Sequence, residues 1–185
     1  MIRSSVYVGA SVDGFIARTD HRLDFLDSAE PVDGDMGFAD FMASVDVLVM
    51  GRTTFEVVLD LVSGDDGLDW PYDVPVVVMS TTGPAVPAEL ADRVETTAEA
   101  PRAILDDLSS RGFRHVYVDG GRTIQSFLRA GLIDEIIVTT IPVLIGDGIP
   151  LFGELADDVV LIHEDTTVYE NGCVQTHYRT RQLGA

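Results

Sequence analysis

Two stretches of the sequence place glycine, arginine and threonine directly after a short apolar run, where a helix is expected to begin. The residues of these two junctions are Gly51, Arg52, Thr53 and Thr54 in the first, and Gly120, Gly121, Arg122 and Thr123 in the second. A helix start displays unpaired backbone N–H groups and the positive end of the helix dipole, and glycine lets an anion approach that backbone closely. Each junction therefore has the chemistry of a phosphate site.

Either junction alone is equally well read as an ordinary capped turn that carries a surface arginine. Two such junctions on one parallel sheet would meet at its carboxyl edge, where α/β proteins bind ligands. The pair therefore predicts an elongated ligand with separated phosphates, and the plain turn remains the alternative for each.

Other chemistry is missing from the sequence. It contains no G-x-x-x-x-G-K-[ST], no G-x-S-x-G and no H-E-x-x-H, so P-loop, nucleophile-elbow and zincin sites are not expected. The single cysteine, Cys173, has no partner for a disulfide or a zinc site and is expected to be a small buried side chain. The four histidines are scattered. No metal site is predicted.

The charge is strongly negative, with 12 basic against 31 acidic residues and a net charge of −19, and every basic residue is arginine. Such a chain repels nucleic acid. No segment has the length of a membrane span or the pattern of a signal peptide, so a cytoplasmic protein without membrane contact is expected. Acidity without lysine fits a salt-rich cytoplasm or a GC-biased genome, and we favour the halophilic interpretation.

The periodicity predicts a three-layer α/β/α domain over residues 1–185. Strands are expected at 5–11, 45–50, 74–80, 115–120 and 134–141. These apolar runs lack polar alternation, which is typical of strands covered on both faces of a parallel sheet, and amphipathic helical patterns lie between them. Near the end of the chain, Asn171-Gly172 predicts an antiparallel hairpin.

Five blocks together resemble, in order and spacing, the dihydrofolate reductase-like superfamily. They are "ASVDGFIA" (10–17), "VLVMGRTTFE" (47–56), "VVVMSTT" (76–82), "VDGGRTIQSFL" (118–128) and "IDEIIVTTIPVLIGDGIPLF" (133–152). Within this superfamily the chain is most similar to the reductase (C-terminal) domain of the riboflavin-biosynthesis enzyme RibD and its free-standing relatives. The fold this implies is dihydrofolate reductase-like, with a mostly parallel central sheet and a C-terminal antiparallel hairpin.

The resemblance implies an NADPH site, with NADH as the other possible dinucleotide. Arg52 would approach the 2′-phosphate, Thr54 the diphosphate, and Gly120 and Gly121 would give the diphosphate room from the other side. The positions that match the family's cofactor contacts are Ile16, Ala17, Gly51, Arg52, Thr53, Thr54, Ser80, Thr81, Gly120, Gly121, Arg122 and Thr123. Ile16 and Ala17 match the nicotinamide end. The relatives often form homodimers, so a homodimer is also implied.

The sequence departs from the dihydrofolate reductase pattern at two places. No arginine stands near Ser80 and Thr81, so Arg52 is the one evident partner of a 2′-phosphate. The Leu-Pro-Trp element is replaced by "RLDFLDSAEPVDGD" (22–35), so we expect a different pocket for the small heterocyclic substrate.

Asp35 resembles the pterin-binding carboxylate of dihydrofolate reductases by position, and Thr139 the threonine that bonds it. A buried carboxylate there could hold a protonated heterocycle and assist proton delivery. The alternative, which we favour, is that Asp35 is a plain helix cap. Asp13 is similarly either a turn former or a group beside the nicotinamide.

Three functional hypotheses follow. The leading one is an NAD(P)H-dependent reductase acting on a C=N bond of a pyrimidine- or pterin-like compound, as in the reductase step of riboflavin biosynthesis. The deaminase step is excluded because its zinc signature needs more than one cysteine. Dihydrofolate reduction and a non-catalytic nucleotide-binding protein of the same fold are the alternatives.

The charge generates the first prediction. Self-repulsion from a net charge of −19 acts over a screening length that falls from about 30 Å at 0.01 M salt to about 10 Å at 0.1 M. We expect the melting temperature to rise between dilute buffer and molar KCl, measured by circular dichroism. A flat response would contradict the halophilic interpretation.

Overall fold

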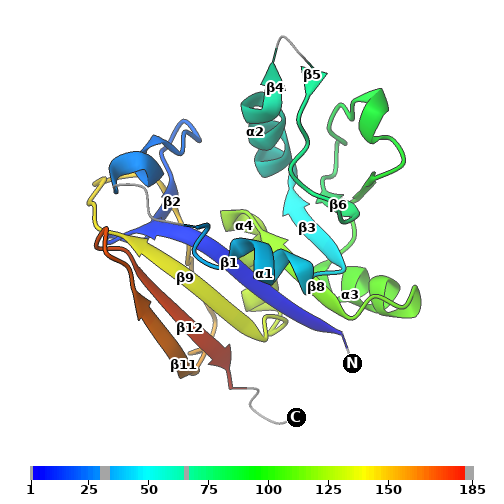
Figure 1. Cartoon of the computed structure of the whole chain (residues 1–185). Helices are drawn as coiled ribbons and strands as arrows, with labels where there is room; N and C mark the ends of the chain where they lie inside the picture. Colours follow the sequence, from blue (N-terminus) through cyan, green and yellow to red (C-terminus); the bar gives the residue numbers. More distant parts are fainter. Residues whose placement is uncertain (1, 30–33, 65–66, 182–185) are drawn as a thin grey trace.

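The computed structural model describes residues 2–29, 34–64 and 67–181. Its centre is an eight-stranded sheet in the order β11-β12-β9-β1-β8-β3-β6-β7 (Figure 1). The strands of this sheet are β1 (Arg3–Ser11), β3 (Val47–Gly51), β6 (Val76–Met79), β7 (Val94–Thr97), β8 (His115–Asp119), β9 (Glu135–Ile141), β11 (Leu161–Val168) and β12 (Val174–Thr180). Two small ladders flank it, β2 (Phe15–Ala17) with β10 (Ile149–Pro150), and β4 (Ser63–Gly64) with β5 (Gly67–Leu68).

The six strands from β9 to β7 run parallel, and β12 and β11 close the other end of the sheet in antiparallel pairs. The predicted mostly parallel sheet is therefore confirmed. The central strand β3 shows the physical reason, because Val47–Met50 is fully buried with an apolar side chain toward each face.

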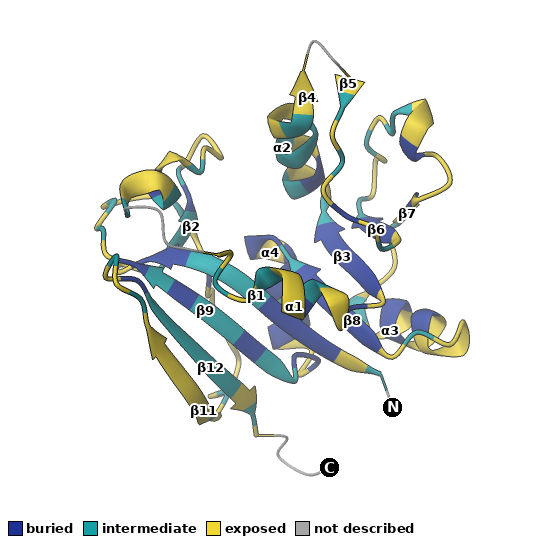
Figure 2. Cartoon of the chain, in the orientation of Figure 1, coloured by how far each residue is buried: buried dark blue, intermediate teal, exposed yellow. Residues whose placement is uncertain are grey.

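The helices form a layer on each face, as predicted. The layers consist of α1 (Phe38–Ala43) and α2 (Arg52–Val62) on one face, and α3 (Pro101–Ser110) and α4 (Gly121–Arg129) on the other. The first layer packs Phe41 and Phe55 on the sheet, and the second packs Leu108 and Phe127. The strand β3 between these layers is buried along most of its length (Figure 2). Two short 3₁₀ turns, η1 (Asp24–Ser28) and η2 (Ala88–Leu90), lie in the connections.

The C-terminal hairpin is present, but its turn is longer than Asn171-Gly172 alone suggests. The N–H of Gly172 donates to the carbonyl of Tyr169, and the N–H of Tyr169 donates to the carbonyl of Cys173. Gly172 has a φ of 83°, which is the left-handed residue that a three-residue hairpin loop requires. Cys173 is fully buried at the end of this loop.

One strand of the main sheet and two pairs of short strands, β2–β10 and β4–β5, were not predicted. Strand β7 is half polar, with the sequence Val-Glu-Thr-Thr, and lies at the sheet edge, where one side of the strand is open to solvent. The segment after α2 carries the β4–β5 ladder. Its Trp70 and Tyr72 pack edge to face at 5.3 Å.

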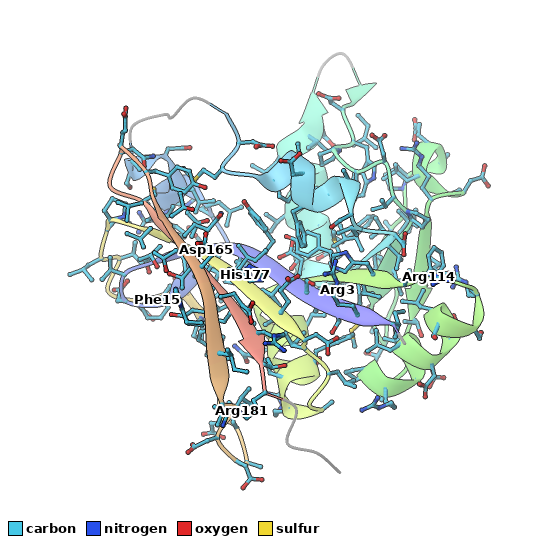
Figure 3. The ribbon with its side chains drawn as sticks, turned by 60° about the horizontal axis from the view of Figure 1, so that its bottom comes forward. Arg3, Phe15, Arg114, Asp165, His177 and Arg181 are labelled. Atoms are coloured by element: carbon cyan, nitrogen blue, oxygen red, sulfur yellow. The ribbon has the colours of Figure 1, made fainter. Side chains whose placement is uncertain are left out.

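The amino ends of the parallel strands are joined by a polar cluster. The Ser5 hydroxyl lies 2.8 Å from Nε2 of His115 and donates to Glu135 at 2.6 Å, and His177 lies 2.8 Å from the other oxygen of Glu135. Arg3, which lies 2.9 Å from Nδ1 of His115, and His177 come forward when this end is turned to the viewer (Figure 3). Burial lowers the pKa of His115. Two of the four histidines are therefore structural.

Within the described ranges, no helix is long and apolar enough to span a membrane.

Candidate functional site

The two glycine-rich junctions lie side by side in the fold. Strands β3 and β8 are parallel neighbours, with Val49 opposite Val118 and Met50 opposite Asp119. The helix after β3 turns to one face of the sheet and the helix after β8 turns to the other. A crevice opens at the carboxyl edge where neighbouring strands send their helices to opposite faces, and this is the usual ligand site of open α/β sheets.

The two junctions fit into each other through glycine and threonine. A Cβ at Gly51 would stand 2.8 Å from Oγ1 of Thr123, and a Cβ at Gly120 would overlap Oγ1 of Thr54. Gly120 also has a φ of 90°, which side chains rarely tolerate. Each glycine thus makes room for the threonine of the other junction.

Gly121 has a packing role that the sequence analysis did not predict. A Cβ at this residue would point at Ile149, Pro150 and Ile16, at 3.1–3.3 Å. Gly121 therefore lets the β2–β10 ladder pack on the start of α4, and its predicted role toward a phosphate stays a prediction.

Both helix starts keep their N–H groups available. Helix α2 begins after Gly51 and α4 after Gly120, and neither has a side chain that caps its first turn. In most helices a Ser, Thr, Asp or Asn side chain satisfies one of these donors. Two uncapped starts that converge on one crevice form a strong anion site, because the dipoles of both helices act on it.

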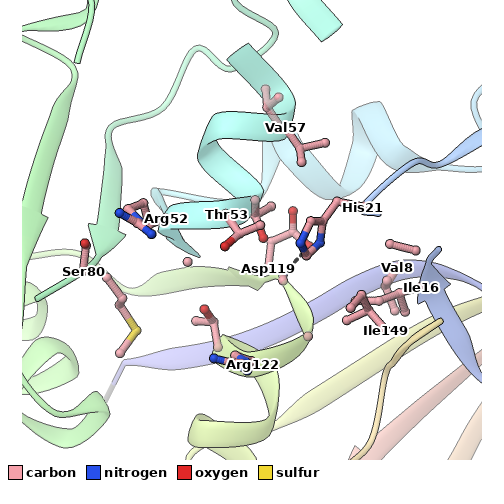
Figure 4. A pocket seen from close by; sticks show the side chains of 18 of the residues that line it. Val8, Ile16, His21, Arg52, Thr53, Val57, Ser80, Asp119, Arg122 and Ile149 are labelled. Atoms are coloured by element: carbon pink, nitrogen blue, oxygen red, sulfur yellow. Dashed lines mark hydrogen bonds between the residues drawn. The ribbon is translucent and has the colours of Figure 1, made fainter. Parts of the chain in front are cut away.

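A cleft of about 1070 Å³ opens over these junctions (Figure 4). It is walled by β1, β2 and the ends of β3, β6, β7 and β8, by one face of α2, by the start of α4 and by the segment around η1. All twelve residues that the sequence predicted as cofactor contacts lie on its wall: Ile16, Ala17, Gly51, Arg52, Thr53, Thr54, Ser80, Thr81, Gly120, Gly121, Arg122 and Thr123. The fold thus brings these four separate segments of the chain to one surface.

The two arginines stand on either side of the crevice, both exposed (Figure 4). Arg52 donates to the hydroxyl of Thr82 at 3.2 Å and lies 3.7 Å from Glu56 on the next helical turn. The Ser80 hydroxyl accepts the N–H groups of Thr82 and Gly83, so the turn after β6 is fixed close to Arg52. Sequence analysis did not single out Thr82 as a site residue, because it belongs to no motif that marks it as one.

Asp119 lies on the floor of the cleft, between the two helix starts, and sequence analysis missed it (Figure 4). It is the last residue of β8, and its carboxylate accepts the N–H of the adjacent Gly120 at 2.7 Å. Burial raises the pKa of Asp119 from 3.8 to about 6, against the lowering effect of that hydrogen bond. In the sequence, Asp119 is an acid followed by two glycines, and this pattern alone indicates a turn rather than a site residue.

Two buried tyrosines adjoin this carboxyl group. Tyr72 and Tyr117 both line the cleft, and burial together with the charge of Asp119 raises the pKa of each. The hydroxyl of Tyr117 donates to the carbonyl of Tyr7 at 2.9 Å. Both phenols therefore stay protonated, which leaves Asp119 as the group of this cluster that titrates near neutral pH.

Asp35 and Thr139 have different hydrogen-bond partners. Asp35 is exposed and off the cleft wall. It accepts the N–H groups of Ala39 at 2.5 Å and Gly37 at 3.0 Å, and these bonds lower its pKa. Thr139 is buried and accepts from Gln175 at 2.9 Å. Asp35 thus has the geometry of a helix cap, and the pterin-carboxylate alternative finds no buried acid here.

Asp13 also serves the backbone. Its carboxylate accepts the N–H groups of Gly146 at 2.7 Å and Ile145 at 3.2 Å, and it does not line the cleft. Part of the segment predicted to reshape the substrate pocket, residues 30–33, lies outside the described residues. Among the described residues, no three histidine, cysteine or acidic side chains are grouped so that they could hold a metal ion.

Comparison with known proteins agrees with this arrangement. The family model of the RibD C-terminal domain matches residues 5–175. The Bacillus subtilis protein YwjB, which is uncharacterized, is 33% identical over 177 residues, covering 95% of this chain and 97% of YwjB.

Two solved structures extend the comparison. The crystal structure of a candidate riboflavin biosynthesis protein from Shewanella sp. PV-4 is 40% identical and covers 98% of this chain and 100% of its own, with a TM-score of 0.90. A diaminohydroxyphosphoribosylaminopyrimidine deaminase/5-amino-6-(5-phosphoribosylamino)uracil reductase from Thermotoga maritima shares the fold, with a TM-score of 0.71 and 14% identity. The match covers 97% of this chain and 57% of the Thermotoga chain.

The interlocking of the junctions predicts a specific coupling. Gly51 has an ordinary φ of −77°, so Gly51→Ala tests the steric contact with Thr123 alone. Overpacking of this kind costs about 1–3 kcal/mol of unfolding free energy. We expect Gly51→Ala to lower the unfolding free energy by this amount in the parent protein and in a Thr123→Val background, because valine keeps a branched side chain at residue 123. In a Thr123→Ala background most of this loss should disappear. A double-mutant cycle measured by urea unfolding tests the coupling. An equal loss in all three backgrounds would contradict the interlocking.

Because Asp119 is buried, replacing it with a neutral side chain should raise the unfolding free energy by an amount that depends on pH. Because its folded pKa of about 6 exceeds the ordinary 3.8, the protonated form is favoured on folding, and this stability is lost as pH rises from about 4 to about 6. At pH 7.5, Asp119→Asn should raise the unfolding free energy by on the order of 3 kcal/mol, since one pKa unit corresponds to about 1.36 kcal/mol.

The asparagine keeps the acceptor for Gly120, so the difference should vanish at pH 3.8. A gain of the same size at both pH values would show that ionisation of Asp119 is not its cause.

Proposed function

The chain belongs to the RibD C-terminal domain family, and we propose that it is an NADPH-dependent reductase that transfers a hydride to a C=N bond of a pyrimidine- or pterin-like heterocycle. The family supports a reductase-like function, and RibD reductases generally use NADPH. The observation that carries the proposal for this chain is the meeting of two uncapped helix starts, each with an arginine, on one cleft.

The residues of the cleft fit a dinucleotide in a defined direction. The N–H groups at the starts of α2 and α4 would bind the diphosphate, helped by the hydroxyls of Thr53 and Thr54. Arg52 and the turn at Ser80 and Thr81 would bind the 2′-phosphate and the adenosine. Their neighbour Thr82, which already accepts from Arg52, would keep the guanidinium oriented.

The nicotinamide end would then lie toward β1 and β2, where Val8, Gly9, Ile16 and Ala17 line the cleft. When bound, the reduced nicotinamide supplies the hydride. Hydride transfer requires from the protein mainly that two carbons are held at the right distance and that water is kept out. The apolar side chains of Val8 and Ile16 meet the second requirement.

Reduction of a C=N bond also needs one proton at nitrogen. Asp119 is the group on the cleft wall whose pKa, about 6, suits this role. In its protonated form it would donate to the nitrogen of the substrate, and in its ionised form it would hold a substrate that is already protonated.

The alternatives weigh less. The dihydrofolate reductase hypothesis requires Asp35 as a buried acid, but Asp35 is exposed and its carboxylate accepts backbone N–H groups. A nucleotide-binding protein without turnover would have the same cofactor half of the cleft, but it gains nothing from a carboxyl group whose burial destabilises the fold. A homodimer and a cytoplasmic location remain proposals.

The arginines give the direct test of cofactor binding. Arg52→Ala should weaken NADPH about ten- to a hundredfold, because it removes a charge-assisted bond of roughly 1.5–3 kcal/mol. NADH lacks the 2′-phosphate and should lose much less. Arg122→Ala should weaken both dinucleotides alike, since both carry the diphosphate. Calorimetric titration of both cofactors into each variant measures the effects.

Arg129→Ala is the matched control, because Arg129 is an exposed arginine at the far end of the same α4 helix. Equal losses of NADPH and NADH in Arg52→Ala would contradict the assignment of the 2′-phosphate, and no loss in either cleft variant would sink the proposed function.

A further inference from the structure

Positive charge is distributed unevenly around the cleft. The sequence has twelve arginines and no lysine, and none of the twelve falls in the residues that the structure leaves undescribed. Two of the twelve line the cleft, Arg52 and Arg122. Both stand at the helix starts, so the fold places its cleft cations together at one end.

Two other arginines lie close in sequence to the cleft wall and are already paired. Nε of Arg18 lies 2.7 Å from Asp24, and Nε of Arg22 lies 2.7 Å from Asp20. The remaining eight arginines are off the wall: Arg3, Arg93, Arg102, Arg111, Arg114, Arg129, Arg179 and Arg181. Arg3 and Arg114 belong to the opposite edge of the sheet, which faces the viewer in Figure 3.

The outer part of the cleft is instead apolar. Helix α2 contributes Val57, Val58 and Leu61, and the η1 segment contributes Leu23 and Leu26; we call these five residues the apolar wall. Leu61 is nine residues beyond Arg52 in the same helix, about 13 Å along its axis at 1.5 Å per residue. A group seated against Leu61 is therefore beyond direct contact with Arg52.

Apart from the two arginines, the described cleft wall carries two acids, Asp119 and Glu99, and one exposed histidine, His21. A phosphate seated against the apolar wall would lose hydration and meet no arginine there, which is strongly unfavourable. The net charge of −19 adds a general repulsion.

We infer that the substrate of this reductase is a nitrogen heterocycle with an uncharged tail and no phosphate. The inference rests on the proposed function, because it assigns both cleft arginines to the dinucleotide. It separates this chain from the Thermotoga maritima protein, whose name specifies a phosphoribosylamino substrate. The reaction itself is unchanged: a hydride from the dinucleotide goes to carbon, a proton goes to nitrogen, and the C=N bond becomes a single bond.

The first test uses ribose 5-phosphate, the phosphorylated tail by itself. The full-length protein is saturated with NADP⁺ and then titrated with ribose 5-phosphate at pH 8. We expect no binding by calorimetry up to about tenfold the concentration that saturates the Thermotoga maritima protein, the positive control. Binding in the same range as that control overturns the inference.

The binding of NADP⁺, which is measured first, distinguishes a failure of the proposed function from a failure of the inference about the substrate. Absence of NADP⁺ binding would sink the proposed function and the inference with it. Binding of NADP⁺ followed by binding of ribose 5-phosphate would sink the inference alone.

The second test introduces a cation into the apolar wall. Leu61 is 67% exposed, so Leu61→Arg is tolerable for the fold, and Leu61→Gln is the polar control without charge. We expect Leu61→Arg to strengthen binding of ribose 5-phosphate at least tenfold relative to Leu61→Gln. Equal binding by the two variants would show that the ligand tail does not pass the apolar wall.

The third test compares turnover. With NADPH, 5-amino-6-(D-ribosylamino)uracil and its 5′-phosphate differ by the phosphate alone. A kcat/KM for the phosphorylated compound at least tenfold below that of its partner supports the inference, and an equal or higher value overturns it.

Discussion

The site depends on one steric constraint at the carboxyl edge of β3 and β8. Helices α2 and α4 leave the sheet toward opposite faces, yet their first turns touch, because Gly51 leaves room for Thr123 and Gly120 leaves room for Thr54. A side chain at either glycine would push the helices apart and widen the crevice. The close approach lets both helix dipoles act on one anion, which a single helix start does more weakly.

The carboxyl group of Asp119 is held at the same point at a cost in stability. It ends β8 between the two helix starts, and burial near Tyr72 and Tyr117 raises its pKa to about 6. A fold selected for stability alone would place an amide or an apolar side chain here. Titratable groups that destabilise a fold and face a cleft are commonly retained for chemistry, and proton delivery to a reduced nitrogen is the chemistry that this position suits.

The acidic composition limits what the rest of the cleft can bind. With twelve arginines against 31 acids, most cations are held by nearby carboxylates or lie on distant surfaces, as the pairs Arg18–Asp24 and Arg111–Glu95 show. The cleft keeps two arginines at the helix starts and lines its outer part with valine and leucine. In the proposed function, cofactor recognition and substrate recognition would therefore be separated along α2, with charge at its start and apolar side chains further along.

The sequence by itself determined the features that depend on local periodicity and on residue type. Unbroken apolar runs such as Val47–Met50 indicated a buried parallel sheet, the helical stripes indicated layers on both faces, and glycine with arginine after two strands indicated the junctions that line the cleft. Only the tertiary structure decided the features that depend on distant neighbours. Asp119 differs from other acids because of what buries it, and Asp35 is a cap because solvent and backbone N–H groups surround it. Burial and contact arise when segments far apart in the chain meet, so no local pattern encodes them.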